Sequence, residues 1–264
     1  MKVSVNIVTR NRPILLTRAI DSVLSQDFDD YEIVVVDNSG IDAVAEHVGQ
    51  FNNPKIKLVY YPTASCGLTQ ARNAGLLKSE GKYIAVLDDD DIFIDKSKLR
   101  TQAKFLDMNS DYVLTGTDIT VASPEGVILG IKEYPHSDNE IRQTILTANP
   151  FCHSTTMFTH KAVLDVGGYE QVEGMWNTNE YKLWLKLGLI GKMINLKMSG
   201  TRYTHWVNSQ SLKHRAKLYL YDLNMAMDFN TSYPNFGDAL QRYIIQHPLR
   251  YALRMKWWKK IDQS

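Results

Sequence analysis

The sequence predicts an α/β fold with a mostly parallel, Rossmann-like sheet, helices on both faces and a helical C-terminal extension. In the first 95 residues, four strand-like segments alternate with three helix-like segments, the pattern of parallel β-α-β units. Polar clusters follow three of these strands, at the end where doubly wound sheets bind ligands. The composition, with 44% hydrophobic and 22% charged residues among 264, is that of a globular protein able to bury a full core.

Strands are predicted where β-branched residues alternate or run together, and helices where apolar residues recur at helical spacing. The predicted strands of this half cover residues 3–8, 31–36, 56–61 and 82–87. The predicted helices begin near Leu15, Ala43 and Gly67. Because Ile33–Val36 is apolar at every position, it is typical of a strand buried on both faces.

The second half has a less regular pattern. Its predicted strands cover residues 111–120, 126–131, 153–159 and 193–198, and its predicted helices cover 139–146, 161–166 and 180–188. There is no internal repeat or low-complexity linker. We therefore predict one domain over 1–210, with halves of about 1–95 and 96–210, and a helical extension over 211–264.

Charge and cysteine content exclude several classes of protein. The 30 Lys and Arg residues nearly balance 29 Asp and Glu, so no charge excess indicates a nucleic-acid partner. Cys66 and Cys152 cannot build a disulfide framework and lack C-x-x-C spacing, so we expect packing residues in a reducing compartment. No run approaches the roughly 18 apolar residues of a membrane helix, and the start does not resemble a signal peptide. We expect a cytoplasmic protein, with peripheral membrane contact left open.

Four consecutive carboxylates, Asp88–Asp91, form the strongest local signal. Crowded carboxylates repel one another, and a bound divalent cation removes that cost. Carboxylate oxygens suit Mg²⁺ or Mn²⁺, and Mg²⁺ commonly takes one or two of them and completes its shell with phosphate and water. The alternative is a solvated acidic turn in which Asp91 caps the next helix. The position after a buried strand favours the metal.

Asp37 and Arg72 are the next candidates. Asp37 follows an apolar strand, so its carboxylate must accept hydrogen bonds from a base edge, a ribose hydroxyl or its own Asx-turn. Arg72 lies on the helix that begins near Gly67, from which it could hold a pyrophosphate or pair with Asp37 or the tetrad.

The second half offers one candidate base and three ambiguous residues. Glu180 opens an amphipathic helix, where it could complement the helix dipole or take a proton from an acceptor hydroxyl. His153, His205 and Trp206 have no role that the pattern alone decides.

Together these segments resemble the family-2 glycosyltransferases of GT-A fold, which use nucleotide-diphospho-sugars. The resemblance covers about residues 3–210 and is most specific over the first 95. Its motifs are the opening strand and turn Val3–Pro13, the helix Ala19–Gln26, the strand Glu32–Ser39, the arginine motif Gly67–Gly75 and the DxD-bearing strand Tyr83–Asp91.

The resemblance implies a nucleotide-binding half over 1–95, an acceptor half over 96–210 and a role for each matching residue. Asp90 would bind Mn²⁺ or Mg²⁺, which acts as a Lewis acid on the diphosphate. Thr9 and Asp37 would hold the base and Asp88 the ribose. The residues expected at the nucleotide-sugar are Thr9, Arg10, Asp37, Arg72, Asp88 and Asp89.

Relatives of this kind are inverting enzymes that act by a single displacement with one carboxylate base. Their base is the Asp of a Glu-Asp pair before a Leu-Trp-Leu helix, and here Asn179-Glu180 stands at that pair. Glu180 is thus the expected catalytic base, although its extra methylene moves the carboxylate by roughly 1 Å or more. A second departure is Trp206, where relatives often have a His that faces the metal or diphosphate.

The resemblance implies transfer of a sugar, most often from a UDP-sugar, to a saccharide or lipid-linked saccharide in bacterial surface polysaccharide synthesis. The departures at Glu180 and Trp206 keep a second reading open, a catalytically impaired nucleotide-sugar-binding or assembly subunit. A sugar-nucleotide pyrophosphorylase is a weaker alternative because the turn Thr9–Pro13 lacks the glycines of that class.

The segment 249–260 interleaves Arg and Lys with Trp, Tyr, Leu and Met. Such a segment is typical of an interfacial helix on an anionic membrane, and equally of a helix that packs on the core with its basic face in water.

Overall fold

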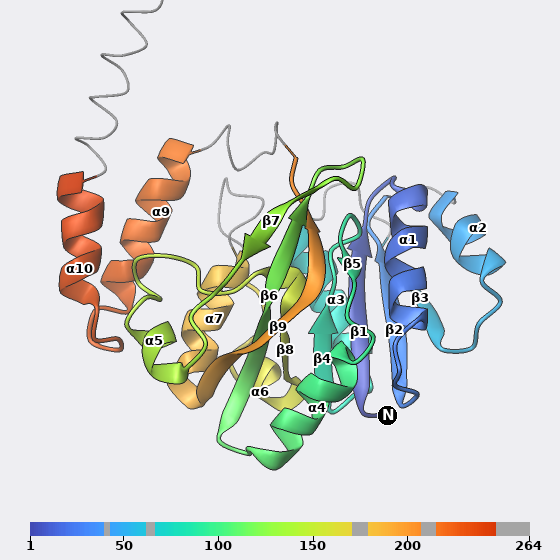
Figure 1. Cartoon of the computed structure of the whole chain (residues 1–264), viewed down its shortest axis with the longest axis horizontal. Helices are drawn as coiled ribbons and strands as arrows, with labels where there is room; N and C mark the ends of the chain where they lie inside the picture. Colours follow the sequence, from blue (N-terminus) through green and yellow to red (C-terminus); the bar gives the residue numbers. More distant parts are fainter. Residues whose placement is uncertain (40–42, 62–66, 171–178, 207–214, 247–264) are drawn as a thin grey trace, which may run out of the picture.

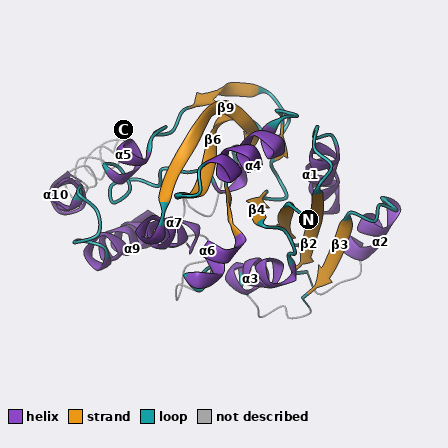
Figure 2. Ribbon diagram, turned by 90° about the horizontal axis from the view of Figure 1, so that it is seen from below, coloured by secondary structure: helices purple, strands orange, loops and turns teal. Residues whose placement is uncertain are grey.

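The computed structural model describes residues 1–39, 43–61, 67–170, 179–206 and 215–246. Within these residues, nine strands form one mixed sheet in the order β3-β2-β1-β4-β8-β6-β9-β5, with β7 paired to β6 (Figure 1). Helices flank this sheet on both faces, as the sequence predicts (Figure 2).

The first half of the chain forms the parallel part of the sheet. Its strands are β1 (Val3–Thr9), β2 (Tyr31–Asp37), β3 (Ile56–Tyr60) and β4 (Tyr83–Val86). Its helices are α1 (Pro13–Leu24), α2 (Ala43–Gln50) and α3 (Leu68–Lys78). β1 lies at the centre, parallel to both β2 and β4, and every residue of β2 is buried. The continuous apolar run therefore predicted a central strand correctly.

The second half makes the sheet mixed. Its strands are β5 (Ile92–Phe93), β6 (Tyr112–Ala122), β7 (Ile128–Lys132), β8 (Met157–Thr159) and β9 (Lys192–Thr204). Its helices are α4 (Lys98–Met108), α5 (Asp138–Arg142), α6 (His160–Asp165) and α7 (Asn179–Ile190). Short β8 pairs antiparallel with β4 on one side and β6 on the other, and so joins the two halves.

The predicted strand over 153–159 is wrong in its first half. Residues His153–Thr155 form a 3₁₀ turn, and only Met157–Thr159 is strand. The hydroxyls of Thr155 and Thr156 donate to the carbonyls of Cys152 and His153, each at 2.8 Å. Hydroxyl groups that bond the local backbone compete with a strand ladder, which explains why β-branched threonines do not extend β8 here.

Two buried clusters lie on opposite faces of the sheet. One cluster packs α1, α2 and α4 against β1 and β2, and the other packs α3, α6 and α7 against β4, β6 and β8. Figure 2 shows α3 and α6 along one side of the sheet and α1 on the other. The loops that follow β1, β2 and β4 lie at one end of the sheet because these strands run parallel.

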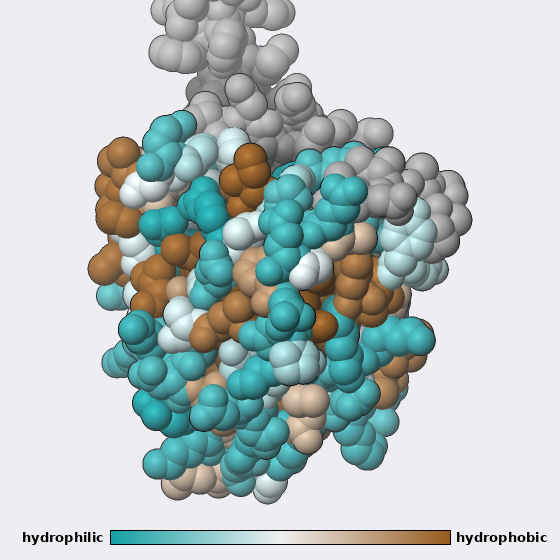
Figure 3. Space-filling model, turned by 90° about the vertical axis from the view of Figure 1, so that its right-hand side faces the viewer, coloured by the Kyte–Doolittle hydropathy of each residue, from teal (hydrophilic) through white to brown (hydrophobic). Residues whose placement is uncertain are grey.

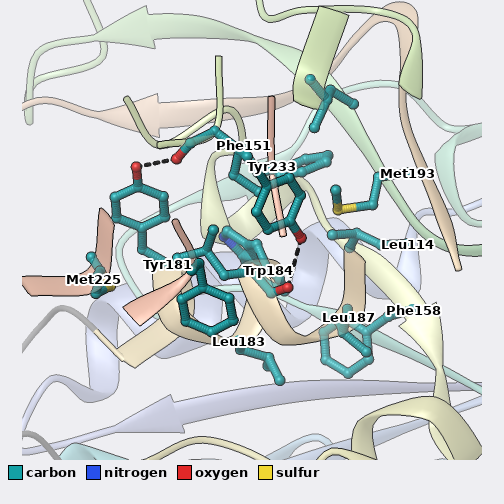
Figure 4. Packing of buried hydrophobic residues seen from close by; sticks show 14 of the residues in the cluster. Leu114, Phe151, Phe158, Tyr181, Leu183, Trp184, Leu187, Met193, Met225 and Tyr233 are labelled. Carbon is teal, nitrogen blue, oxygen red and sulfur yellow. Dashed lines mark hydrogen bonds between the residues drawn. The ribbon is translucent and has the colours of Figure 1, made fainter. Parts of the chain in front are cut away.

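The described part of the C-terminal extension packs on the second cluster. It contains α9 (Arg215–Asp228), α10 (Phe236–Leu240) and a π-helical turn (Gln241–Gln246). The Tyr233 hydroxyl donates to the Leu185 carbonyl on α7 at 2.7 Å, beside the fully buried Trp184 (Figure 4). The extension thus shares a core with α7, while the boundary at residue 210 stays a prediction. Cys66 and the segment 249–260 lie outside the described residues.

The surface is mixed in polarity. On the side of α1 and α2, hydrophilic side chains cover most of the lower half, and hydrophobic ones gather in patches above (Figure 3). Elsewhere β7 exposes Ile128, Leu129 and Ile131 by 57–69% on its edge of the sheet. Among the described residues, no helix has the length and apolar character needed to cross a membrane.

Candidate functional site

The carboxyl ends of β1, β2 and β4 meet because the three strands are parallel neighbours. Thr9, the last residue of β1, stands opposite Asp37, the last residue of β2, in the strand register. The Thr9 hydroxyl donates to Asp89 Oδ2 at 2.7 Å, so the tetrad after β4 adjoins the end of β1. Three of the predicted polar clusters therefore come together, as parallel strand order requires.

The tetrad divides into a buried pair and a more accessible pair. Asp91 is 1% exposed and accepts hydrogen bonds from the Ser154 hydroxyl at 2.5 Å and the Thr204 amide at 2.8 Å. Burial, and then Asp88 and Asp90, raise the pKa of Asp91 well above its usual range. Asp91 leads into β5 rather than capping a helix. It ties the tetrad to β9 and to the turn before β8.

Asp89 is the second buried member, at 5% exposure. Burial raises the pKa of Asp89 to about 6 against the opposing effects of Arg12 and the Thr9 hydroxyl. Because its two oxygens accept from Thr9 and Arg12, this carboxylate faces the β1–α1 turn.

Arg12 is a site residue that the sequence reasoning missed. Its Nη1 donates to Asp89 Oδ1 and to Asp90 Oδ2, each at 3.0 Å. Arg12 precedes the proline that opens α1, and Asn11 before it has φ 55°, in the left-handed region. The signal in the sequence that could have indicated Arg12 is its position as a second basic residue, directly before the proline that begins α1. Arg10, which we predicted instead, is exposed and makes no hydrogen bond or ion pair with a described residue.

Asp90 accepts a hydrogen bond from Trp206, the residue that departs from the expected family pattern. Trp206, two residues after the end of β9, donates from Nε1 to Asp90 Oδ2 at 3.0 Å. Burial and then Asp88 raise the pKa of Asp90, while Arg12 and Trp206 oppose that rise. The backbone amide of His205 donates to the Ala122 carbonyl at 2.8 Å. Trp206 therefore occupies the place beside the expected metal aspartate.

Asp88 has a different set of partners from Asp90. Its Oδ1 lies 3.0 Å from His153 Nδ1 and 3.5 Å from Arg72 Nη2. Burial opposes ionisation, but His153 and Arg72 together lower the pKa of Asp88 far below its usual range. The side chain keeps 39% exposure, so the ionised carboxylate remains accessible to a ligand.

Arg72 connects this strand end to α7. The guanidinium is 8% exposed, and its Nη1 donates to Glu180 Oε2 at 3.0 Å. Burial acts against its charge, but Glu180 and Asp88 raise the pKa of Arg72. Of the alternatives left open for Arg72, the structure shows pairing with the tetrad, through Asp88. It brings the predicted base Glu180 next to the predicted donor residue Asp88.

Asp37 has one satisfied and one unsatisfied oxygen. Oδ1 accepts from the Ser39 amide at 2.8 Å, which is the Asx-turn alternative. Oδ2 is buried without a hydrogen-bond partner among the described residues, and so is Asn38 Oδ1. A buried acceptor without a donor carries a desolvation cost that a ligand's N–H or O–H group would remove.

The carboxylates also decide whether a divalent metal fits. In the described part of the chain, no group of three or more His, Cys, Asp or Glu side chains is arranged to hold a metal by itself. Asp88 Oδ2 and Asp90 Oδ1 make no hydrogen bond with a described residue. Two hard oxygen donors fit an ion of the Mg²⁺ or Mn²⁺ type that takes its remaining ligands from a diphosphate and water.

Comparison with known proteins adds the family. The model of the family described as glycosyl transferase family 2 matches residues 4–168. WbnJ, an O-antigen biosynthesis glycosyltransferase of Escherichia coli, is 28% identical over 171 residues, 64% of this chain and 65% of that protein. An uncharacterized glycosyltransferase of Rickettsia bellii is 33% identical over 159 residues, 60% of this chain and 22% of that protein. The chain thus spans less than two thirds of either relative.

Solved structures give the same fold at lower identity. Staphylococcus aureus TarS, residues 1–349 in complex with UDP-GlcNAc, matches with a TM-score of 0.71 and 20% identity, over 94% of this chain and 72% of that one. The mannosyltransferase PcManGT from Pyrobaculum calidifontis, in complex with GDP-Man and Mn²⁺, matches with a TM-score of 0.71 and 17% identity, over 94% and 71%. The fold is GT-A, and the chain belongs to glycosyl transferase family 2.

Proposed function

We propose that this protein is an inverting glycosyltransferase that moves a sugar from a nucleotide-diphospho-sugar to a saccharide or lipid-linked saccharide acceptor. One observation carries the proposal. Arg72 lies 3.0 Å from Glu180 and 3.5 Å from Asp88, so a single guanidinium joins the predicted base to the predicted donor site. The relative WbnJ, named as an O-antigen biosynthesis glycosyltransferase, supports bacterial surface polysaccharide as the product class.

The nucleoside is proposed to bind at the ends of β1 and β2. Asp37 Oδ2 needs a donor, and the ring N–H of uracil or guanine is one. Asp88, ionised and partly exposed, would accept from the ribose hydroxyls. We favour a UDP-sugar. The neighbours named above bind UDP-GlcNAc and GDP-Man respectively, so both nucleotide classes belong in the test.

The diphosphate is proposed to lie over the tetrad. Asp90, with Asp88 beside it, would hold a divalent metal, which supplies Lewis-acid stabilisation of the leaving diphosphate. Arg12 is near enough to Asp90 to add a second positive charge there. These charges would offset the burial that raises the pKa of Asp90.

Glu180 is proposed as the general base. Oε2 is bound by Arg72, whereas Oε1 makes no hydrogen bond with a described residue, and the side chain is 18% exposed. Oε1 would accept the proton of the acceptor hydroxyl while that oxygen bonds to the anomeric carbon. The bond from this carbon to the diphosphate breaks in the same step, and the displacement inverts the anomeric configuration.

The test is a thermal-shift panel of UDP-, GDP-, dTDP- and CMP-sugars, each with and without Mn²⁺. A ligand that binds only the folded state raises the melting temperature by mass action. We expect a shift with one nucleotide class that depends on Mn²⁺ and is lost in Asp90→Ala. Asp165→Ala, which removes an exposed acid on α6, is the control. No shift with any donor would contradict the proposal.

A second candidate function is a nucleotide-sugar-binding subunit without turnover. The observation behind it is that Trp206 and Arg12 both donate to Asp90 Oδ2. Release of nucleoside diphosphate in the presence of a mixed saccharide acceptor pool separates the two functions. Binding without release in the wild-type chain would favour the subunit.

The segment 249–260 is proposed to meet an anionic membrane surface, where lipid-linked acceptors are found. Its interleaved basic and aromatic residues support this. Sedimentation with anionic liposomes should fall with added salt and be lost on truncation after Gln246. Unchanged sedimentation after truncation would reject the membrane role.

A further inference from the structure

His153 lies where the donor side and the base side of the site meet. Its ring is 7% exposed. Nδ1 lies 3.0 Å from Asp88 Oδ1 and 3.2 Å from Arg72 Nη2, and Nε2 lies 3.0 Å from the Tyr169 hydroxyl. His153, Asp88 and Arg72 therefore form a triangle, and Arg72 extends it to Glu180.

The chemistry of the three groups decides how the triangle is bonded. A guanidinium only donates hydrogen bonds, and an ionised carboxylate only accepts them. Nδ1 can donate a hydrogen bond to Asp88 or accept one from Arg72, but it cannot do both. Asp88 Oδ1 lies 3.0 Å from Nδ1 and 3.5 Å from the Arg72 guanidinium, where it is placed to accept, so Nδ1 carries the proton and donates to Asp88. Arg72 is held by its two carboxylates instead.

This assignment also fixes the other nitrogen of the ring. In the neutral imidazole with Nδ1–H, Nε2 is an acceptor, and the Tyr169 hydroxyl donates to it. Burial raises the pKa of Tyr169 to well above its usual value, so the hydroxyl keeps its proton. The Tyr169 hydroxyl can therefore pair with the tautomer that donates to Asp88.

The ring is also held in place by its surroundings. It packs against Tyr169 with centroids 5.9 Å apart and against Trp184 of α7 at 6.2 Å. The next residue, Ser154, donates its hydroxyl to Asp91 and accepts at the same oxygen from the Asp88 amide. The 3₁₀ turn before β8 therefore sets both the ring and the backbone of the tetrad.

We propose that His153 is a positioning residue for sugar transfer, which fixes the Asp88 carboxylate against Arg72 through Nδ1–H. It does not touch the reacting atoms. It acts through Asp88, which would hold the donor, and through Arg72, which holds Glu180. The inference rests on the proposed function, because it takes Asp88 and Glu180 as the donor and base residues.

Two isosteric substitutions test it. The Asn amide nitrogen can take the place of Nδ1, and the Gln amide nitrogen can take the place of Nε2. His153→Asn should keep nucleotide affinity within about threefold of the wild type, because the bond to Asp88 is retained. His153→Gln loses that bond and should weaken affinity by about tenfold or more, the usual effect of losing a hydrogen bond to a charged group. Affinity is measured by calorimetry with Mn²⁺ and the nucleoside diphosphate that the thermal-shift panel selects.

A double-mutant cycle distinguishes positioning from general damage. In an Asp88→Asn background, His153→Gln should change nucleotide affinity by less than about twofold, because its partner charge is already gone. Tyr169→Phe should weaken affinity in the same direction as His153→Gln but less. Tyr233→Phe, which removes a buried hydroxyl bond to the Leu185 carbonyl rather than to a residue of the site, should lower only the melting temperature.

Each outcome bears on one idea. An equal loss of nucleotide affinity in His153→Asn and His153→Gln would overturn the positioning role and leave a packing role. The same conclusion would follow if His153→Gln lowered the affinity equally in the wild-type and the Asp88→Asn backgrounds. Wild-type affinity in His153→Gln would overturn it too. Failure of every nucleotide to bind the wild-type chain would instead overturn the proposed function, and with it this inference.

Discussion

Arg72 Nη1 lies 3.0 Å from Glu180 Oε2, although 108 positions separate the two residues in the chain. Arg72 belongs to α3 in the parallel half, and Glu180 lies in the first turn of α7 in the mixed half. This ion pair therefore links the two halves of the sheet, and in the proposed function it would join the donor side to the base. Its effects on activity are the first matter to test.

Glu180→Gln should lower kcat by about 10²–10⁴, the usual range for removing a general base. The amide can still accept from Arg72, so nucleotide affinity should stay near that of the wild type. Steady-state release of nucleoside diphosphate and calorimetry measure the two quantities. A kcat unchanged by this substitution would remove Glu180 from the chemistry.

Glu180→Asp tests the length of the side chain. The resemblance to family-2 enzymes implies Asp at this position, so an aspartate here should keep part of the activity. Here Oε2 is bound to Arg72, and the shorter side chain would withdraw from that contact. We expect Asp to give lower kcat than Glu and higher kcat than Gln. Activity above the wild type would mean that Arg72 restrains the base.

Asp37→Asn should weaken nucleotide binding by about tenfold, since a hydrogen bond to a charged acceptor is replaced by a neutral one. The unpartnered Oδ2 is the atom concerned. Calorimetry with Mn²⁺ and the selected nucleoside diphosphate measures it. Asp37→Asn should leave the affinity for inorganic pyrophosphate unchanged, because the base is absent. Equal losses for both ligands would argue for a collapsed site.

Lys98 predicts a pH dependence of stability away from the site. It is fully buried, donates to Gln102 at 2.8 Å, and has its pKa lowered to about 7 by burial. Between that value and the ordinary pKa near 10.4, the unfolded chain binds more protons than the folded chain, so stability rises with pH. Relative to Lys98→Met, the wild type should gain up to about 1.4 kcal/mol per pH unit between pH 7 and 10.

The control for Lys98 is Lys104→Met, an exposed position on the same helix. Chemical denaturation at pH 7, 8.5 and 10 gives the difference for each pair. The exposed lysine should show no such trend. A difference between wild type and Lys98→Met that is constant with pH would show that the ammonium stays charged in the fold.

Gly188→Ala should loosen the C-terminal helices. A Cβ at this position of α7 would meet the Tyr233 hydroxyl and the Met193 side chain. Displacing Tyr233 breaks its bond to the Leu185 carbonyl, so we expect a loss of about 1–3 kcal/mol in unfolding free energy. Gly49→Ala, where a Cβ meets nothing within 4 Å, should not destabilise the chain. Equal stability of both variants would contradict the packing described.

The parallel half was predictable because its signals are local and repeated. The apolar run Ile33–Val36 predicts a strand buried on both faces, as in a parallel sheet. Parallel strands place the loops that follow them at one end of the sheet, the carboxyl end. α4 was not predicted because its buried face includes the polar residues Lys98 and Gln102, which interrupt the apolar spacing of a helix. β5 was not predicted because it has only two residues. The turn at His153 escaped because threonines that favour strands bonded their own backbone instead.

The site divides along similar lines. The positions of Asp37 and the tetrad follow from strand ends, and their proximity follows from strand order. Arg12 could not be separated from Arg10 by sequence, because the direction of each side chain depends on the left-handed residue Asn11. The contact of Trp206 with Asp90 needs the full length of β9, which runs six residues beyond the predicted strand.

The shared core of α7 and the C-terminal helices bears on how the protein can be shortened or fused. A recombinant chain that stops near residue 210 would lose Met225, Phe229 and Tyr233, which cover the cluster around Trp184. The apolar side of α7, the helix that carries Glu180, would then be exposed to water. We expect tags and truncations after Gln246 to be better tolerated, because they leave the packing of α9 and α10 on α7 in place.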